Sequence, residues 1–234
     1  IGNGVDFLIA TPGRLLDLLA QKQLDLSQVE TLVLDEADRM LDQGFQDQIQ
    51  MVLNQLPEQR QNLLFSATFN DKITKFTNGL LHDPAIVQCQ RLNKAAEDVK
   101  LIIYEVEQNE KADIVYYLLA NNTQQCLVFA RTRRNANLVD AYLRKKGMSS
   151  AALHSDKSQH LRTQTLQKFK DGEIQILVAT DIAARGLDIE QLPLVINFDI
   201  PRQAEDYVHR IGRTGRAGMR GVAISLMGGD ERSN

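Results

Sequence analysis

Two groups of residues in this chain have the types and the spacing that phosphoryl-transfer chemistry needs. Asp-Glu-Ala-Asp at residues 35–38 ends a short apolar run, and a basic run at residues 209–216 lies near the other end of the chain. A carboxylate after a strand can hold Mg²⁺ through the water shell of the ion, and its neighbour can orient a water for attack. Arginines can stabilise charge on a transferring phosphoryl group. The candidates for this chemistry are Asp35, Glu36, Arg213 and Arg216.

Each group also has a simpler structural interpretation. The acidic tetrad could be the start of a helix after a strand, and the basic run could be a solvated surface. Three arginines recur at every third residue of the basic run, and a helix would place them near one face. Gly212 and Gly215 are poor residues for a helix interior, so they favour a helix start or a turn that meets an anion.

Two further motifs follow apolar runs in the first part of the chain. The hydroxyls of Ser66-Ala67-Thr68 could relay the state of a bound nucleotide through hydrogen bonds, or they could simply form a turn or a helix cap. In Thr11-Pro12-Gly13-Arg14, a proline at a helix start leaves backbone amides free to meet an anion. This segment is therefore either a phosphate-backbone contact or an ordinary helix start.

Other polar groups lie in the second part of the chain. Residues 177–189 combine a strand with a loop that contains hydroxyl, carboxylate, arginine and glycine side groups, and Asp188 could accept from a ribose hydroxyl. The alternative is a plain strand–turn–strand connection. Gln159 and Arg162, at a helix start, could contact a phosphate backbone. Arg131 follows a strand and could contact nucleic acid or be solvated.

The composition of the 234 residues, 43% of them apolar, fits one large or two small globular domains. No apolar run is long enough to cross a membrane, and the N-terminus lacks the pattern of a secretion leader. Cys89 and Cys126 have no metal-ligand spacing, which favours buried thiols in a reducing compartment. These features predict a cytoplasmic protein.

The charge is unevenly distributed along the chain. Residues 1–97 carry 8 Lys/Arg and 13 Asp/Glu, a net charge of −5, whereas residues 98–234 carry 19 and 17, a net charge of +2. A mildly basic half is compatible with nucleic-acid binding, although local patches matter more than the sum.

Short apolar runs alternate with amphipathic stretches, which predicts an α/β fold with parallel sheets covered on both faces. The predicted strands are 7–9, 31–34, 62–65, 85–87, 101–106, 126–130, 151–153, 174–179, 194–198 and 222–226. The predicted helices are 13–21, 46–56, 71–80, 111–120, 133–146, 159–169 and 204–211. Ligands gather at the carboxyl ends of such strands, where the motifs above all lie.

The order of these motifs resembles that of the DEAD-box ATP-dependent RNA helicases of superfamily 2, most closely the bacterial RhlE-type subgroup. The matching segments are 11–14, 35–38, 66–68, 159–162, 179–189 and 209–216. They occur in the family's order over nearly the whole chain. The resemblance implies two RecA-like domains that close around ATP and single-stranded RNA and separate short duplexes locally.

The resemblance also implies a role for each matching residue. Asp35 would lie near Mg²⁺, Glu36 would orient the attacking water, and Arg213 and Arg216 would be arginine fingers from the second domain. The implied cofactor-binding residues are Asp38, Asp188, which approaches the ribose, and His209, which links to the coupling residues Ser66 and Thr68. The implied RNA path is lined by Thr11, Gly13, Arg14, Gln159, Arg162, Thr180, Arg185 and Gly186. Such a path grips backbone and sugar, so little sequence preference is expected.

The chain departs from the family's pattern at its beginning. No Gly-Lys pair occurs in the sequence, so there is no Walker A loop to hold the β- and γ-phosphates. The resemblance places Ile1 in the middle of a first domain whose N-terminal half is missing. We therefore expect an incomplete first domain over 1–89, a linker over 90–98, and a second domain over 99–234 that is slightly short at its C-terminus.

Three functions remain open from the sequence. The first is a fragment of an ATP-dependent RNA helicase. The second is a non-catalytic RNA-binding module that carries half of an ATP site and is expected to be inactive alone, because the phosphate loop is absent. The third is a motor of the same kind that acts on DNA.

Overall fold

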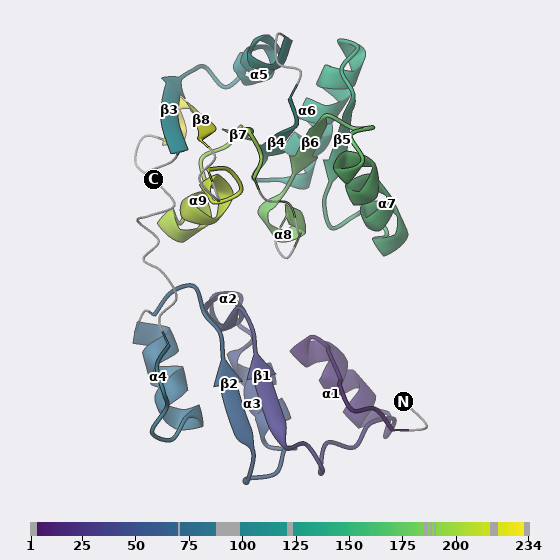
Figure 1. Ribbon diagram of the computed structural model, residues 1–234, viewed down its shortest axis with the longest axis vertical. Coiled ribbons are helices and arrows are strands. Elements are labelled where there is room, and N and C mark those ends of the chain that lie inside the picture. The colour runs from purple at the N-terminus through teal and green to yellow at the C-terminus, as the bar shows by residue number, and fades with distance from the viewer. Residues whose placement is uncertain are drawn as a thin grey trace. The chain divides into compact units, whose positions relative to one another are not determined.

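The computed structural model describes residues 4–69, 71–87, 99–120, 124–184, 187, 189, 191–215 and 220–231. The chain divides into two compact units, Ile1–Val87 and Gln88–Asn234 (Figure 1). The expected linker at 90–98 lies outside the described residues.

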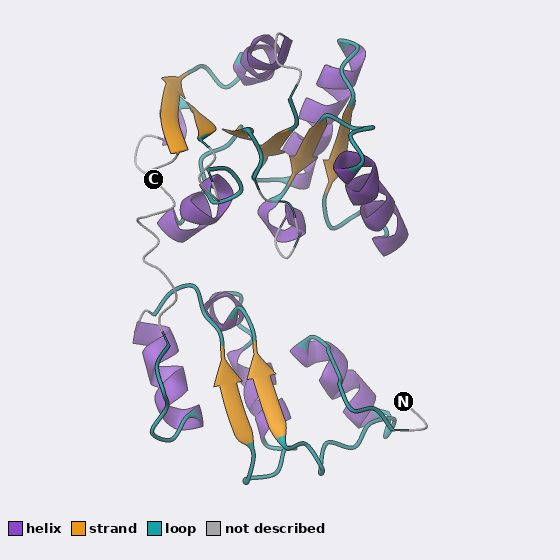
Figure 2. Cartoon of the chain, in the orientation of Figure 1, coloured by secondary structure: helices purple, strands orange, loops and turns teal. Residues whose placement is uncertain are grey.

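The first unit is built on a two-stranded parallel sheet, drawn as two arrows of the same direction in Figure 2. The strands are β1 (Thr31–Leu34) and β2 (Gln61–Leu64), and Leu34 pairs with Leu64 at their carboxyl ends. The helices of this unit are α1 (Pro12–Ala20), α2 (Ala37–Asp42), α3 (Gln46–Leu53) and α4 (Asp71–Leu80).

A small core holds this unit together. Leu34 from β1, Ile49 from α3 and Ile73 and Leu80 from α4 are buried together. Ile73 and Leu80 lie two helical turns apart, so they share the face of α4 that meets the sheet. This spacing explains why a helix is predicted correctly over 71–80.

Two of the predicted strands are wrong. Residues 7–9 and 85–87 have no strand structure, and the side chains of Phe7, Ile9 and Ile86 are 91%, 98% and 82% exposed. A strand is stabilised by the hydrogen bonds of a neighbour. Among the described residues no strand other than β1 and β2 belongs to this sheet, so these apolar runs have no partner there.

The second unit contains a six-stranded sheet whose strand order is β3-β8-β7-β4-β6-β5. Every pairing in it is parallel, as the alternation of strands and helices predicts. The strands are β3 (Val99–Glu105), β4 (Cys126–Phe129), β5 (Ser150–Leu153), β6 (Ile176–Ala179), β7 (Leu194–Asn197) and β8 (Gly221–Met227).

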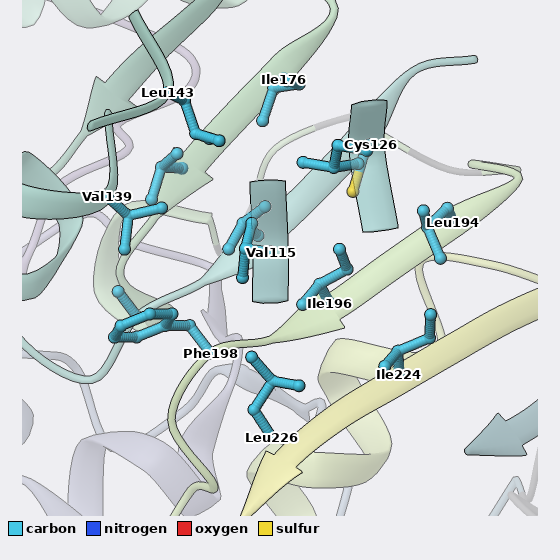
Figure 3. Packing of buried hydrophobic residues seen from close by; sticks show 14 of the residues in the cluster. Val115, Cys126, Val139, Leu143, Ile176, Leu194, Ile196, Phe198, Ile224 and Leu226 are labelled. Atoms are coloured by element: carbon cyan, nitrogen blue, oxygen red, sulfur yellow. The ribbon is translucent and has the colours of Figure 1, made fainter. Parts of the chain in front are cut away.

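Helices cover both faces of this sheet. Successive strand residues point to opposite sides, and apolar residues on both sides are buried against helices. Cys126 of β4 lies in one core with Val115 and Val139 (Figure 3). Val128 of β4 belongs to the same core, and Val115 and Val139 come from two different helices. Leu127 and Phe129 face a second core on the other side. The helices on the first face are α5 (Lys111–Ala120) and α6 (Arg133–Lys145). Those on the second face are α7 (Gln159–Lys170), α8 (Asp181–Ala184) and α9 (Ala204–Ile211). A 3₁₀ helix, η2 (Gly229–Glu231), follows β8.

None of the helices in the described part of the chain has the length and apolarity needed to span a bilayer.

Candidate functional site

In the first unit, the acidic tetrad and the Ser-Ala-Thr segment lie side by side. Residues 35–38 follow β1 and residues 66–68 follow β2, two parallel neighbours whose carboxyl ends meet at one edge. The amide of Ala37 donates to the carbonyl of Phe65 at 3.1 Å. The edge predicted from the sequence therefore brings these two motifs together.

Asp38 links the two motifs directly. Its side chain is buried, and Oδ2 accepts from the amide of Thr68 at 2.9 Å and from the hydroxyl of Thr68 at 3.0 Å. The hydroxyl of Ser66 donates to the carbonyl of Thr68 at 2.7 Å, which closes the turn. A charged acceptor with two donors from one residue forms a strong connection. Asp38 thus holds the Ser66–Thr68 turn in a fixed position beside the tetrad.

Asp35 and Glu36 face solvent at the same edge. Glu36 has φ +51°, the left-handed conformation that non-glycine residues rarely adopt, and its amide donates to Oδ1 of Asp35 at 2.9 Å. Strained backbone of this kind clusters at functional sites. Among the described residues no group of three metal-binding side chains occurs. A single exposed carboxylate such as Asp35 can hold Mg²⁺ through the water shell of the ion.

Thr11, Gly13 and Arg14 form the start of α1. Thr11 is the N-cap and Pro12 the first helical residue, as expected for a helix start with exposed amides. Arg14 is 60% exposed at its side chain and pairs with Asp17 one turn later at 2.5 Å. Gly13 lies close to α3, because a Cβ there would be in ordinary van der Waals contact with Oε1 of Gln48, at 3.4 Å.

In the second unit, Arg210 of the basic run is a buried structural residue. Its guanidinium group makes a two-pronged ion pair with Asp181, with Nε–Oδ1 2.6 Å and Nη2–Oδ2 2.8 Å. Nη1 also donates to the carbonyl of Asp199 at 2.6 Å, and the group lies over the ring of Phe129. Arg210 is 1% exposed, so its charge interacts with groups of this unit and not with solvent.

The turn that Gly212 and Gly215 favour is present, so Arg210 and Arg213 do not share one helical face. Helix α9 ends at Ile211 and Gly212 is its C-cap, so Arg213 lies in the following turn. Glycine ends the helix because it has little helix propensity. Nη1 of Arg213 donates to the carbonyl of Leu187 at 2.9 Å, which ties this turn to the loop after α8. His209 is half-buried on the last turn of α9.

Four predicted site residues lie outside the described residues: Arg185, Gly186, Asp188 and Arg216. Thr180, from the same loop, is described. Its side chain is buried, and its carbonyl accepts from the amides of Ala183 and Ala184, so it begins α8. The alternative of a plain strand–turn–strand connection is wrong, because a short helix follows β6.

Arg131 is held by a buried network that the sequence did not indicate. Its guanidinium pairs with Glu231, and Nη2 also donates to the carbonyl of Ile200 at 2.9 Å. Glu231 accepts in addition from Nζ of Lys111 at 2.6 Å, and both of these side chains are almost fully buried. Arg131 is thus more than a solvated side chain. Residues this far apart in the sequence have no spacing that could have predicted the network.

Gln159 and Arg162 lie together on the first turn of α7, as expected. Nη1 of Arg162 donates to Oε1 of Gln159 at 3.2 Å. Ser158 caps the helix through its hydroxyl, which accepts from the amide of Leu161 at 3.3 Å. This cap fixes the residue at which the helix begins, and it thereby places Gln159 and Arg162 on the first turn.

His154 lies nearby, at the end of β5. Its side chain is buried, and Nε2 is 2.9 Å from Oδ1 of Asn137, while Nδ1 has no partner within the described structure. Burial lowers the pKa of His154 below its ordinary value of 6.5, and the charges of Lys157 and Arg133 lower it further against the opposite effect of Asp156.

The second unit is an α/β domain with a parallel sheet covered on both faces, and in the first unit the polar motifs lie at the carboxyl ends of two parallel strands. Residues 1–76 match the family described as DEAD/DEAH box helicase, and residues 110–218 match the helicase conserved C-terminal domain. The chain belongs to the DEAD-box helicase family. Both units are therefore RecA-like, and the first has a sheet of two strands among its described residues.

Similar proteins include ATP-dependent RNA helicases from bacteria and yeasts. The chain is 44% identical to the ATP-dependent RNA helicase RhlB of Pseudomonas syringae over 97% of this chain and 58% of the relative. It is 44% identical to the ATP-dependent RNA helicase DBP2 of Lodderomyces elongisporus over 99% of this chain and 43% of the relative. The chain thus spans about half the length of these relatives.

A solved structure agrees with this family assignment. The structure of Dbp5 from S. cerevisiae bound to RNA and ADP BeF3 matches with a TM-score of 0.81 and 34% identity, over 94% of this chain and 58% of that one. The assignment to the RhlE-type subgroup stays a prediction.

Proposed function

We propose that this chain is part of an ATP-dependent RNA helicase that couples ATP hydrolysis to local unwinding and remodelling of RNA duplexes. The observation that carries the proposal is the link from Asp38 to Thr68. It joins the tetrad that would act on ATP to the turn that would report the state of the nucleotide. The relatives named as ATP-dependent RNA helicases support the same function.

The tetrad would act on the phosphates of ATP. Mg²⁺, when bound, would neutralise part of the charge on these phosphates. Asp35 would hold the ion through water, and Glu36 would orient the attacking water, because both carboxylates face solvent at the carboxyl edge of β1. Asp38 was expected beside the nucleotide. Its bonds to Thr68 favour a role in positioning the tetrad.

The second unit would supply positive charge and further nucleotide contacts. Arg213 and Arg216 would stabilise the charge of the transferring phosphoryl group, and Asp188 would approach the ribose. His209 would link to the turn that contains Ser66 and Thr68. These roles rest on the family's pattern.

The RNA would be gripped through its backbone, with little sequence preference. The exposed first turns of α1 and α7 support this, because each presents an arginine beside a helix start. The proposed contacts are Thr11, Gly13, Arg14, Arg131, Gln159, Arg162, Thr180, Arg185 and Gly186.

A second candidate is a non-catalytic RNA-binding module. It is favoured by the lack of any Gly-Lys pair in the chain, because the amide nest and lysine of a Walker A loop are what hold the β- and γ-phosphates. We expect the 234-residue chain to bind single-stranded RNA and to show no measurable ATP hydrolysis. ATP hydrolysis by this chain that Glu36→Gln abolishes would exclude the second candidate.

The helicase function is tested on a longer product of the same gene, if the DNA upstream of the Ile1 codon encodes an in-frame Gly-Lys-Thr loop. RNA-stimulated ATPase activity is then expected, and Glu36→Gln should lower kcat on the order of 100-fold or more, because the attacking water loses its carboxylate. Glu30→Gln, an acid just before β1, is the matched control and should leave kcat unchanged.

The choice between RNA and DNA needs a parallel measurement. Single-stranded RNA and DNA of the same sequence are compared as activators, and a protein that reads the 2′-hydroxyl should respond to RNA alone. Equal stimulation by both would support the DNA-directed alternative. An absence of stimulation by either would exclude the helicase function.

A further inference from the structure

Strand β3 is an edge strand of the second unit, with one side open among the described residues (Figure 1). Its only neighbour there is β8, and the amide of Val106 donates to the carbonyl of Met227 across that pairing at 3.0 Å. Backbone amides of a strand alternate in direction. The amides of Leu101 and Ile103 therefore point to the open side, where another strand could pair with them.

The side chains of β3 lack the usual protection of an edge strand. Leu101, Ile103 and Tyr104 are 47%, 61% and 42% exposed. Natural proteins guard such edges with proline, bulges or several lysines, whereas the seven residues of β3 contain one lysine, Lys100, and no proline. An exposed apolar edge on a folded domain is typical of an interaction site.

A groove lies beside this edge, between β3 and α5. It has a volume of about 420 Å³ and is lined mostly by apolar atoms. Tyr117, on the α5 side, is 71% exposed. Tyrosine offers a large apolar ring and a hydroxyl, a combination enriched at interfaces. The lining residues are Tyr104, Glu105, Val106, Ile114, Tyr117 and Leu118.

The surface around the groove is acidic. Glu105, Glu107, Glu110 and Asp113 are exposed on the end of β3, the connection to α5 and the first turn of α5. The two basic residues of the segment 99–120 do not offset them there, because Lys111 is buried against Glu231 and Lys100 lies at the other end of β3. Lys146, just after α6, lies over the ring of Tyr116 and interacts with Asp113, so the acidic character comes from Glu105, Glu107 and Glu110. This charge favours a basic partner segment and disfavours the phosphate backbone of RNA.

We propose that the edge of β3 and the adjoining groove are a docking site for an extended segment of a partner protein. The segment adds as a strand to β3 and pairs with the amides on its open side. An aromatic or branched aliphatic side chain of the segment fills the groove beside Tyr104 and Tyr117. Lysine or arginine residues next to it meet Glu107 and Glu110. This site is separate from the residues proposed above for ATP and RNA.

The test uses the 234-residue chain and a fluorescein-labelled peptide of sequence Lys-Lys-Val-Phe-Val-Lys-Lys. Fluorescence anisotropy should rise and saturate with the wild-type chain. Tyr117→Ala should weaken binding about tenfold, as expected for a central aromatic contact. Reversal of charge at Glu107 and Glu110 to lysine should also weaken binding and remove most of its salt dependence. Leu161→Ala, at an apolar residue of α7 that is 47% exposed, should bind as the wild type does.

A second probe tests the backbone pairing without any change to the protein. The same peptide with alternate backbone nitrogens methylated cannot form a strand ladder, and its binding should fall at least about tenfold. The proposal is wrong if the unmodified peptide does not bind, or if Tyr117→Ala binds as the wild type does. It is equally wrong if single-stranded RNA displaces the peptide, because the occupant would then be RNA. It is also wrong if sedimentation shows a dimer that Ile103→Lys dissociates, because the occupant would then be a second copy of the chain.

Discussion

Arg210 and Arg213 are three positions apart in one basic run, yet their guanidinium groups have different surroundings. Arg210 is enclosed by Asp181, Asn197, the carbonyl of Asp199 and the ring of Phe129. Arg213 follows the end of α9 and is only partly buried. The charge of Arg210 therefore stabilises the fold, and the phosphate-binding role proposed above for the basic run rests on the residues after the helix.

Removal of Arg210 should destabilise the second unit strongly. Arg210→Ala leaves the carboxylate of Asp181 without its partner, and loss of one member of a buried ion pair costs about 3–5 kcal/mol. All five tyrosines lie after residue 98, so urea unfolding followed by tyrosine fluorescence reports on this unit alone. Arg202→Ala, an exposed arginine just before α9, is the control and should change the free energy of unfolding by about 0.5 kcal/mol or less. Equal effects of the two substitutions would show that the ion pair stabilises nothing.

His154 should make the second unit less stable in mild acid. Its folded-state pKa is lowered, so the unfolded chain takes up the proton first as the pH falls below about 6.5. Stability is thus complete above that pH and declines below it, by at most about 1.4 kcal/mol per pH unit for one proton. The urea midpoint is measured between pH 8 and pH 5. His154→Gln should flatten this part of the profile, and His160→Gln, at an exposed position, should leave it as in the wild type. A profile that is the same for all three proteins would contradict the assignment.

At the scale of elements, the 3₁₀ helix η2 is fastened to the sheet by Glu231. One oxygen accepts from Nζ of Lys111 and from the amide of Gly228, and the other accepts from the amide of Ile200 and from Arg131. Ile200 leads into Pro201 and α9, which carries His209. The network thus joins α5, η2 and the segment that precedes the basic run.

The charge of Glu231 is needed because Lys111 is fully buried. Glu231→Gln keeps an acceptor for the amides but leaves the ammonium group without a counter-charge, which should cost about 3–5 kcal/mol of unfolding free energy. Lys111→Met combined with Glu231→Gln should recover a large part of that loss, because the uncompensated charge is gone. Glu173→Gln, at an exposed turn, serves as the control. A double variant no more stable than Glu231→Gln alone would contradict this account.

The sequence predicts elements well where a period is long enough to recognise. The bounds of α4, α5 and α9 match their predictions because each helix has two or more turns with an apolar face. Helix α8 was missed, and α2 was given only as the alternative interpretation of the acidic tetrad, since four and six residues are too short to establish a period. The motifs at the strand ends were also predictable, because parallel neighbours bring their carboxyl ends to one edge.

The buried ion pairs could not be predicted from the sequence. Arg210 with Asp181, and Glu231 with Lys111, join residues that are far apart along the chain. A charged residue that will be buried looks the same in sequence as one that will be solvated. The strand predicted at 7–9 is wrong for a different reason. Its apolar residues suit a strand, but no described strand pairs with them.

At the scale of the whole molecule, the two units bury their apolar residues to different degrees. The first unit leaves Val33 of β1 52% exposed and Phe65, just after β2, 55% exposed, because its sheet has two strands within the described part of the chain. The second unit covers a six-stranded sheet on both faces, and all four residues of β4, β6 and β7 are buried. A two-stranded sheet is marginally stable, whereas three or more packed strands support a domain.

The two units should therefore unfold separately, with the first unit unfolding at lower urea concentration. The chain contains no tryptophan, so Phe76→Trp on α4 places a single tryptophan in the first unit while the tyrosines report on the second. The tryptophan signal should change before the tyrosine signal, because the first core is smaller. In the control Tyr117→Trp, at an exposed position on α5, tryptophan and tyrosine signals should change together. A single coincident transition for both probes in the Phe76→Trp chain would mean that the first unit is stable only while the second is folded. The prediction that the two units unfold independently would then be wrong.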